Sequence, residues 1–340
     1  MAQILLVGLA AGAATALLLA SYFTGSPIAA LLVLIAPLPL LIAAMGWHHI
    51  AGLIAAFAGA AALTATLSTY FALRFNVSFS LGATVHSFIA FMVVFGFPNW
   101  WLAYLALLAR PGATPDETEW YPAGRLILWT GALGAAVVTV TLLNFGTDGD
   151  SLRAGLRRVF EQYIRALTRT PADAPLQVPG SSDPNFALDM LVMLFPPMTA
   201  VFVTVLNMLN LWLAGLIVKV SGRLRRPWPD LAATRFPPTA AGALAAAIAG
   251  SFVPGIVGIV AGVFATTLLV CFAVVGFAIV HMITRGMNGR FLILSGVYLA
   301  VGILGWPIFV MVLLGLTDCV LDVRQTFANW RGPPAPPAPT

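Results

Sequence analysis

Two aspartates near the C-terminal end of the chain have a spacing that acid–base chemistry could use. Asp318 and Asp322 lie four residues apart, and Arg324 follows them. Intramembrane aspartyl proteases use two such carboxylates as general acid and base, but they carry them on separate helices. A four-residue spacing puts both carboxylates on one helix, and Thr317 stands before Asp318 where those enzymes have glycine. We therefore interpret Asp318, Asp322 and Arg324 as an interfacial charge cluster, with a partner contact as the alternative.

Three polar side chains interrupt apolar stretches and could contact a small polar ligand. Asn207 and Asn210 are three residues apart and share a helix face, and His86 has Thr84 and Ser87 beside it. Alternatively they bond neighbouring helices, each bond contributing about 0.6 kcal/mol in a membrane. We keep His86, Asn207 and Asn210 as candidate ligand-binding residues, and we favour interhelical bonding for the two asparagines. A single histidine does not make a metal site.

No motif of a familiar catalytic site is present in the sequence. The chain lacks the Gly-x-Ser-x-Gly, His-Glu-x-x-His and Gly-x-x-x-x-Gly-Lys patterns of hydrolases, metalloproteases and nucleotide-binding proteins. Cys271 and Cys319 lie in or beside apolar runs, where free cysteine behaves as a small hydrophobic residue. We predict that the protein is not an enzyme and that it has no catalytic residue, no metal and no cofactor.

Long apolar segments must position these side chains. The 340 residues are 60% hydrophobic and 9% charged, with a mean hydropathy of +0.95, whereas soluble proteins are about 25% charged. A helix needs about 20 apolar residues to cross the roughly 30 Å core of a bilayer, and Ala2–Tyr22, Ile50–Phe71 and Arg290–Leu316 supply them. We predict an all-α, polytopic transmembrane helical bundle with about nine membrane-spanning helices, in a range of roughly eight to ten.

Prolines predict interruptions in several of these helices. Pro37 and Pro39 predict a kink or a break within Ile28–Met45, because proline removes a backbone donor. Leu81–Leu108 contains a glycine and a proline and fits either one kinked helix or two short ones. A proline pair within Phe186–Val220 predicts a short approach segment before the crossing itself.

The positive charges do not indicate a nucleic-acid surface. All but one of the 17 basic residues are arginines, and they are scattered among connecting segments without interleaved aromatics. An excess of basic residues marks the cytoplasmic loops of membrane proteins. With Leu81–Leu108 taken as one crossing, nine basic residues fall on one side and eight, Arg324 and Arg331 among them, on the other. That difference does not decide the orientation.

One polar connection contains a basic amphipathic helix. From Leu152 to Arg169, apolar residues recur at helical spacing on one face, and five arginines lie on the other. Asp150 or Ser151 can cap its start. This pattern predicts a helix that lies in the membrane interface among anionic headgroups. A docking surface for a protein partner is the alternative.

The first helix carries a ridge of small residues, Gly8, Gly12, Ala16 and Ala20, at four-residue spacing. Such a ridge lets another helix approach closely. We keep it as a candidate partner-helix face, and we favour ordinary packing inside the bundle.

Composition divides the chain into four regions. We predict an N-terminal helical half at 1–145, a polar connection with the amphipathic helix at 146–184, a C-terminal helical half at 185–327 and a Pro-rich disordered tail at 328–340.

Three short motifs suggest a family. They are Pro37-Leu38-Pro39-Leu40, Asn210-Leu211-Trp212-Leu213 ahead of Lys219, and Gly315-Leu316-Thr317-Asp318 continuing through Leu321-Asp322-Val323-Arg324. With them the chain resembles the YybS-like bacterial membrane proteins, a family of unknown function. That family is distantly similar, over its N-terminal half, to the substrate-binding subunits of energy-coupling-factor vitamin transporters. Those subunits dock onto a transmembrane coupling protein, driven by ATPases, through small-residue faces of the first helix.

The resemblance implies a function and a location. We expect a substrate-binding or accessory subunit of a membrane transport system without its own ATPase, in the bacterial cytoplasmic (inner) membrane. Its partners would be the lipid bilayer, a transmembrane coupling protein, ATPases and a small-molecule ligand, and no nucleic acid. The alternative is a non-catalytic envelope scaffold that uses the amphipathic helix for docking.

Overall fold

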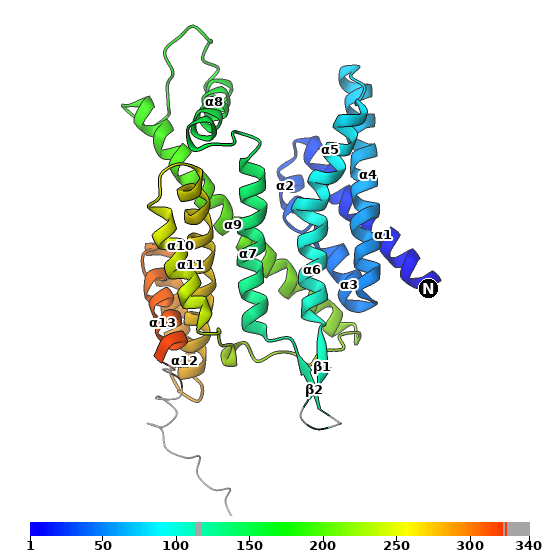
Figure 1. The fold of residues 1–340 in the computed structure, drawn as a ribbon, viewed down its shortest axis with the longest axis vertical. Helices are drawn as coiled ribbons and strands as arrows, with labels where there is room; N and C mark the ends of the chain where they lie inside the picture. Colours follow the sequence, from blue (N-terminus) through cyan, green and yellow to red (C-terminus); the bar gives the residue numbers. More distant parts are fainter. Residues whose placement is uncertain (113, 115–116, 322–323, 325–340) are drawn as a thin grey trace, which may run out of the picture. The chain divides into compact units, whose positions relative to one another are not determined.

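The computed structural model describes residues 1–112, 114, 117–321 and 324. The chain is helical almost throughout (Figure 1) and divides into two compact units, which we describe one at a time. Unit 1 comprises Met1–Pro122 and Phe202–Pro229, and unit 2 comprises Ala123–Val201 and Asp230–Thr340. The expected helical, multi-span membrane protein is confirmed. The predicted tail at 328–340 lies outside the described residues.

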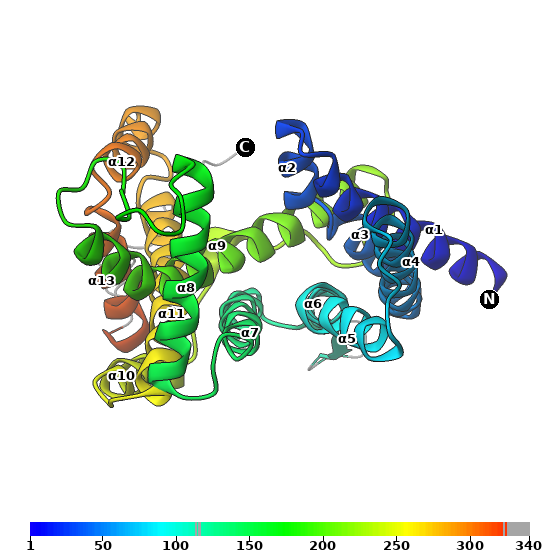
Figure 2. The same cartoon turned by 90° about the horizontal axis from the view of Figure 1, so that it is seen from above.

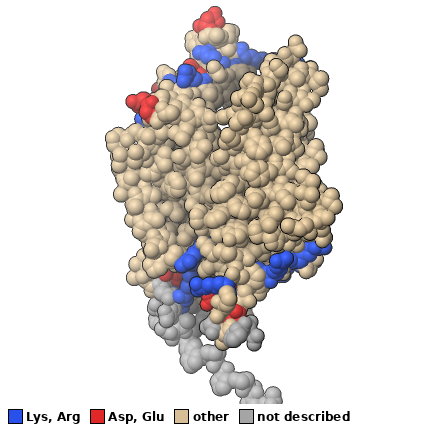
Figure 3. All heavy atoms as spheres, turned by 45° about the vertical axis from the view of Figure 1, so that its right-hand side comes forward, with Lys and Arg blue, Asp and Glu red and all other residues tan. Residues whose placement is uncertain are grey.

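Seven segments of the described chain are long and apolar enough to cross a membrane. They are Ala2–Thr24, Pro27–Gly46, His49–Phe75, Leu81–Ala106, Ala123–Leu142, Pro184–Val220 and Ile256–Ile283. Three further apolar helices are shorter, so by length the structure supplies fewer crossings than the nine expected. On the face drawn in Figure 3, charged side chains gather near the helix ends and leave the stretches between them uncharged. Helices that cross lipid require this distribution, because a charge at the bilayer centre is costly.

Unit 1 consists of helices and one small ribbon. In chain order its helical elements are α1 (Ala2–Ala20), the 3₁₀ turn η1 (Ser21–Thr24), α2 (Pro27–Leu34), α3 (Leu38–Gly46), α4 (His49–Phe75), α5 (Leu81–Phe91), the π-helical turn η2 (Met92–Gly96) and α6 (Phe97–Ala106). A two-stranded antiparallel ribbon follows, in which β1 (Ala109–Pro111) pairs with β2 (Thr118–Trp120). The part of α9 (Pro184–Val220) from Phe202 onward completes the unit.

The interruptions in unit 1 follow from proline chemistry. α2 ends at Leu34 and α3 begins at Leu38, so the break predicted at Pro37 and Pro39 is confirmed. Leu81–Ala106 is one continuous helical segment through α5, η2 and α6, and of the two alternatives the single kinked helix is therefore correct. A proline in the first turn of α6 cannot donate to a preceding carbonyl, and the wider π turn directly before it accommodates that loss.

Unit 2 is arranged around one long helix. Its elements are α7 (Ala123–Leu142), α8 (Gly149–Thr168), the first part of α9, η3 (Leu231–Ala233), α10 (Thr239–Ser251), α11 (Ile256–Ile283), α12 (Arg290–Leu304) and α13 (Ile308–Leu321). α11 packs against α7, α10 and α13. A Cβ at Gly131 of α7 would lie 2.7 Å from the Sγ of Cys271, and a Cβ at Gly276 would lie 2.8 Å from the Cα of Met311. The core of unit 2 therefore depends on glycines at helix crossings.

Two predicted helix limits were wrong. α9 is one helix with Pro196 and Pro197 inside it, so no separate approach segment precedes the crossing. Conversely, Arg290–Leu316 is not one helix, because Gly305 adopts φ +71° and separates α12 from α13. Glycine adopts this left-handed conformation without steric cost, and Pro307 then begins a new direction.

α12 and α13 form a hairpin whose two ends lie at the same end of unit 2. Arg285, just after α11, pairs with Oδ1 of Asp230 at 2.6 Å. Arg324, just after α13, donates from Nη1 to the carbonyl of Ala232 at 2.5 Å. α12 begins at Arg290, a few residues after α11 ends, and Figure 1 shows both helices beside the end of α11. With 15 and 14 residues, the two helices are about 22 Å long.

Candidate functional site

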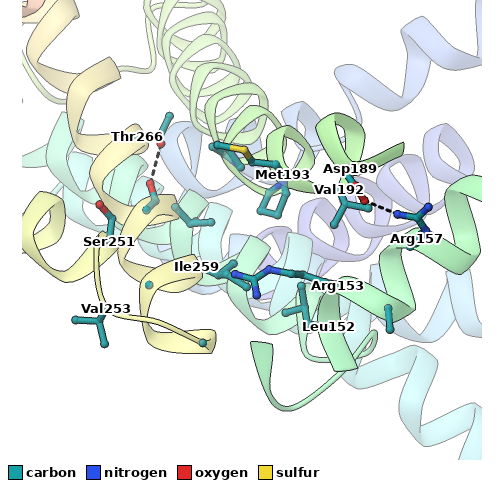
Figure 4. Close-up of a pocket in the computed structure, with 17 residues that line it drawn as sticks. Leu152, Arg153, Arg157, Asp189, Val192, Met193, Ser251, Val253, Ile259 and Thr266 are labelled. Atoms are coloured by element: carbon teal, nitrogen blue, oxygen red, sulfur yellow. Dashed lines mark hydrogen bonds and ion pairs between the residues drawn. The ribbon is translucent and has the colours of Figure 1, made fainter. Parts of the chain in front are cut away.

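A cavity of about 730 Å³ lies within unit 2, where α8 crosses the ends of the other helices (Figure 4). Its walls are the first turns of α8, α9 from Asp189 to Pro197, the turn between α10 and α11, and the first turns of α11. α8 is seen end-on in Figure 1 and along its length in Figure 2. It therefore runs roughly at right angles to α7, α10 and α11 and covers the cavity.

A capping box formed by Asp148 and Ser151 fixes the first residue of α8. Oδ1 of Asp148 accepts hydrogen bonds from the backbone N–H groups of Asp150, at 3.1 Å, and Ser151, at 2.9 Å. The N–H of Asp148 donates to Oγ of Ser151 at 3.3 Å. The cap is therefore Asp148, not Asp150 or Ser151 as expected, and its bonds with Ser151 lower the pKa of the Asp148 carboxyl. A Cβ at Gly149 would lie 2.7 Å from the Cα of Gly255, so glycine lets α8 start against the beginning of α11.

The predicted amphipathic helix is confirmed, and its apolar face packs on unit 2. Leu152 and Leu156 are each 1% exposed, and the ring of Phe160 packs edge-on against Phe195 with centroids 5.2 Å apart. Tyr163 and Leu167 remain exposed. α8 therefore contacts its own unit with one apolar stripe and leaves a second stripe free for lipid.

The mouth of the cavity carries two arginines and one aspartate. Arg157 donates to Asp189 of α9 and, from Nη2, to Oδ1 of Asn185 at 2.7 Å. Arg153 has a looser contact with Oδ1 of Asp150 at 3.5 Å, where the aspartate side chain is 98% exposed. Figure 4 shows Arg153 extending from α8 toward Ile259, while Arg157 turns to Asp189. The charge of Arg157 is paired with that of Asp189, whereas Arg153 is directed at the cavity.

The interior of the cavity is apolar. Val192, Met193 and the proline pair of α9 form one wall, and Ile259 and Val263 of α11 form another. The two hydroxyl groups in the lining are already used, because Ser251 Oγ donates to the Ile248 carbonyl at 2.6 Å and Thr266 Oγ1 to the Gly262 carbonyl at 2.7 Å. Gly255, Gly258 and Gly262 add no side chain, which leaves the space open.

This arrangement suits the binding of a small molecule. An apolar cavity with a guanidinium group at its mouth matches an amphiphile that has an anionic head and a hydrocarbon tail. No nucleophile and base face each other in the lining. Among the residues that the structure describes, no group of three His, Cys, Asp or Glu side chains could hold a metal ion.

The asparagines lie in unit 1, away from this cavity, and one of them bonds the interrupted helix. Nδ2 of Asn210 donates to the carbonyl of Leu34 at 2.9 Å and to that of Leu206 at 3.0 Å. Leu34 is the last residue of α2, where the break frees backbone carbonyls. Asn210 therefore forms an interhelical hydrogen bond, which is the alternative we favoured. Asn207 is also buried.

His86 is exposed on the surface of α5. A smaller cavity of unit 1 is lined by Thr64, Ser68 and Thr84 among others, but His86 does not line it. With His86 exposed and both asparagines buried, the structure does not bring the three candidate ligand-binding residues to one surface.

The small-residue ridge of α1 contacts a helix of the same chain. A Cβ at Gly8 would lie 2.7 Å from Cβ of Ile54, and a Cβ at Gly12 would lie 2.7 Å from Cβ of Ala58. Ala16 is 3% exposed, and Ala20 is partly buried. The ridge is thus packed against α4, which agrees with ordinary packing inside the bundle.

The C-terminal charge cluster is more deeply buried than its sequence position suggested. Oδ2 of Asp318 lies 3.0 Å from Nε of Arg324, and these side chains are only 4% and 5% exposed. Asp322 lies outside the described residues. The pair closes the base of the α12–α13 hairpin.

Sequence reasoning found α8 but missed the cavity beneath it. The signal that could have found it is the acidic residue Asp189, which stands alone in the apolar start of α9 and needs a basic partner. Comparisons with protein-family models, with curated proteins and with solved structures found no match.

Proposed function

We propose that this multi-span membrane protein binds an anionic, lipid-like amphiphile in the cavity covered by α8. The observation that carries the proposal is the guanidinium group of Arg153 at the mouth of a cavity whose interior is apolar. A phosphate head accepts charge-assisted hydrogen bonds from a guanidinium group. A hydrocarbon chain gains about 0.8 kcal/mol for each CH₂ group that it buries. Both halves of an amphiphile are therefore accommodated by adjacent parts of one site.

A charge-removal experiment tests this binding. The purified protein carrying Arg153→Gln should retain less anionic phospholipid than the wild type, measured by native mass spectrometry after exchange into a neutral detergent. Arg158→Gln is the matched control, because Arg158 is exposed on the same helix and does not line the cavity. Equal lipid retention by Arg153→Gln and the wild type would contradict the proposal.

A cavity-filling experiment tests the apolar half. The nearest atom to a Cβ at Gly262 would be Cβ of Ser251, at 3.8 Å, so a side chain there extends into the cavity. Gly262→Leu should lower lipid retention. Gly242→Leu introduces the same side chain on α10, where a Cβ meets nothing within 4 Å, and should leave retention unchanged.

We also propose that the protein serves as a substrate-binding or accessory subunit of a transport system in the bacterial cytoplasmic membrane. The resemblance to the YybS-like proteins and the presence of a binding cavity support this role. Because α4 covers the small-residue ridge, a coupling protein would contact the opposite face of α1, where Leu6 is 66% and Leu17 is 70% exposed. Copurification with a coupling protein and ATPases tests the proposal, and a protein that always purifies alone would contradict it.

The envelope scaffold is a second candidate, favoured by the exposed stripe of α8. Tyr163 and Leu167 are 64% and 65% exposed, and they could contact a partner protein as well as lipid. Tyr163→Ser with Leu167→Ser should release a bound partner in crosslinking experiments if docking is the role of this stripe. Unchanged crosslinks would remove the support for the scaffold.

A further inference from the structure

We infer that the α8 cavity opens toward the extracytoplasmic leaflet, so that its ligand is an anionic phospholipid of that leaflet. This inference rests on the proposed binding function and adds the source of the ligand. It follows from the α12–α13 hairpin, because the hairpin puts Arg324 on the same side of the membrane as the end of α11.

The α12–α13 hairpin begins and ends at the same end of α11. Arg285, just before the hairpin, pairs with Asp230. Arg324, just after the hairpin, donates to the carbonyl of Ala232. Tyr298 in the middle of α12 stacks on Phe277, and its hydroxyl lies 2.9 Å from Nε2 of His281, both near the C-terminal end of α11. The hairpin therefore enters and leaves on one side.

Following the chain places every connection on one of two sides. In unit 1, Arg225 donates to the Trp47 carbonyl at 3.3 Å and Arg226 to the Ala106 carbonyl at 3.2 Å, so the ends of α3, α6 and α9 lie together. In unit 2, Asp230 pairs with Arg285, so the stretch of chain that leads into α10 begins beside the C-terminal end of α11. Leu81–Ala106, Ala123–Leu142 and Pro184–Val220 are successive spanning segments, so the connections at 107–122 and 221–238 lie on the same side of the bilayer, which we call side A. The connections at 25–26, 76–80, 143–183 and 252–255 then lie on the other side, side B.

The basic residues of the described chain are unequally divided between these sides. Side A has ten: Arg110, Arg125, Lys219, Arg223, Arg225, Arg226, Arg235, Arg285, Arg290 and Arg324. Side B has six: Arg74, Arg153, Arg157, Arg158, Arg165 and Arg169. The sequence alone had put Arg324 on the side of α8, because it treated Arg290–Leu316 as a crossing. The excess of basic residues identifies side A as cytoplasmic.

The cavity belongs to side B. α8 lies in the 143–183 connection, and the turn at 252–255 contributes Val253 and Gly255 to the lining. A lipid that reaches Arg153 from the bilayer therefore comes from the extracytoplasmic leaflet. The exposed stripe of α8, with Tyr163 and Leu167, lies at the same level and can rest among the headgroups of that leaflet.

Cysteine labelling tests the orientation independently of binding. Cys319→Ala serves as the background, because Cys271 is fully buried. Single cysteines at the exposed positions Ser182, Ser221 and Met287 are then treated with an impermeant maleimide on intact spheroplasts. We expect Ser182→Cys to be labelled at once, and Ser221→Cys and Met287→Cys only after permeabilisation. The reverse pattern would overturn the orientation, and labelling of Ser221→Cys and Met287→Cys from opposite sides would overturn the tracing.

Leaflet-selective crosslinking tests the source of the ligand. A photoactivatable phosphatidylglycerol is added to one leaflet of neutral-lipid vesicles that contain the protein oriented with Ser182 outside. We expect crosslinks to α8, α9 or α11 residues of the cavity only when the probe is in the outer leaflet, and at least tenfold fewer with Arg153→Gln. Crosslinks from the inner leaflet alone would overturn the leaflet assignment. Crosslinks that are absent from both leaflets and in detergent would instead overturn the binding function.

A competition arm separates a lipid from a free anion. Millimolar inorganic phosphate should leave the crosslinks in place, because the hydrocarbon chain holds the lipid in the apolar interior. Complete displacement by inorganic phosphate would show that the site recognises a free anion, and it would overturn the lipid assignment.

Discussion

At the scale of single residues, Asn210 shows how the membrane-embedded part of unit 1 tolerates an interrupted helix. Pro37 and Pro39 leave carbonyls at the end of α2 without helical partners, and lipid offers no donor in their place. Nδ2 of Asn210 donates to one of them, that of Leu34. The Asn210 side chain thus bonds a carbonyl at the proline break that lies 176 residues away in the sequence.

Replacing Asn210 should therefore destabilise the protein. We expect Asn210→Leu to lower the free energy of unfolding by about 0.6–1.7 kcal/mol, the range of hydrogen bonds between membrane helices. Unfolding in mixed micelles of increasing SDS content measures this difference. Thr66→Val is the control, since Thr66 is exposed and bonds only the Ala62 carbonyl of its own helix. An equal loss in both variants would contradict an interhelical role for Asn210.

Asp230 should make the stability of unit 2 depend on pH. The hydrogen bond with Arg285 holds the pKa of the Asp230 carboxyl below its ordinary value. A carboxyl with a lowered folded-state pKa stabilises the fold above its unfolded pKa of about 3.9, and this contribution disappears as the pH falls through the lowered value.

We expect Asp230→Asn to melt at a lower temperature than the wild type at pH 7, with the difference shrinking as the pH falls below the unfolded pKa of about 3.9. Differential scanning fluorimetry across this pH range measures it. The exposed Asp173→Asn serves as the charge control. A melting difference that persists unchanged at low pH would mean that the Asp230–Arg285 ion pair is not its cause.

At the scale of elements, α8 depends on its first turn. The Asp148 side chain accepts hydrogen bonds from two backbone N–H groups there and so fixes where the helix begins. We expect Asp148→Ala to raise amide hydrogen exchange severalfold in the first turns of α8 and to weaken lipid retention, because Arg153 loses its fixed position. Hydrogen-exchange mass spectrometry of peptides that cover 146–160 measures the change in exchange.

Asp148→Asn is the control, because it keeps an acceptor for the cap. It should restore most of the protection. If it does not, the charge of Asp148 and not the cap stabilises the first turn.

Elements whose limits depend on local chemistry were predictable from sequence, and those that depend on packing were not. Pro37 and Pro39 break a helix because proline lacks a donor, which is a property of the residue itself. The same chemistry failed at Pro196 and Pro197, where the helix continues through both prolines and Phe195 contacts Phe160 of α8. Gly305 looked like one more glycine in an apolar run, and only its positive φ makes it a hairpin tip. The cavity was not predictable at all, since it arises where α8, α9 and α11 converge.

At the scale of the whole molecule, the chain folds as two units that are interleaved in sequence. α9 passes from unit 2 into unit 1 at Phe202, and the chain returns to unit 2 at Asp230. Each unit has its own close helix crossing. A Cβ at Gly12 would lie 2.6 Å from the Ala55 carbonyl oxygen in unit 1, and a Cβ at Gly276 would lie 2.8 Å from the Cα of Met311 in unit 2.

Overpacking one crossing should therefore loosen one unit only. Gly12→Leu and Gly276→Leu should each cost roughly 1–3 kcal/mol, because backbone cannot move aside as a flexible side chain can. We expect Gly12→Leu to raise hydrogen exchange in α1 and α4 while α7, α11 and α13 keep their protection, and Gly276→Leu to do the reverse. Gly242→Leu, in open space on α10, should change neither. If either crossing variant raised exchange equally in both units, the chain would be one cooperative body, since the stability of each unit would then depend on the other.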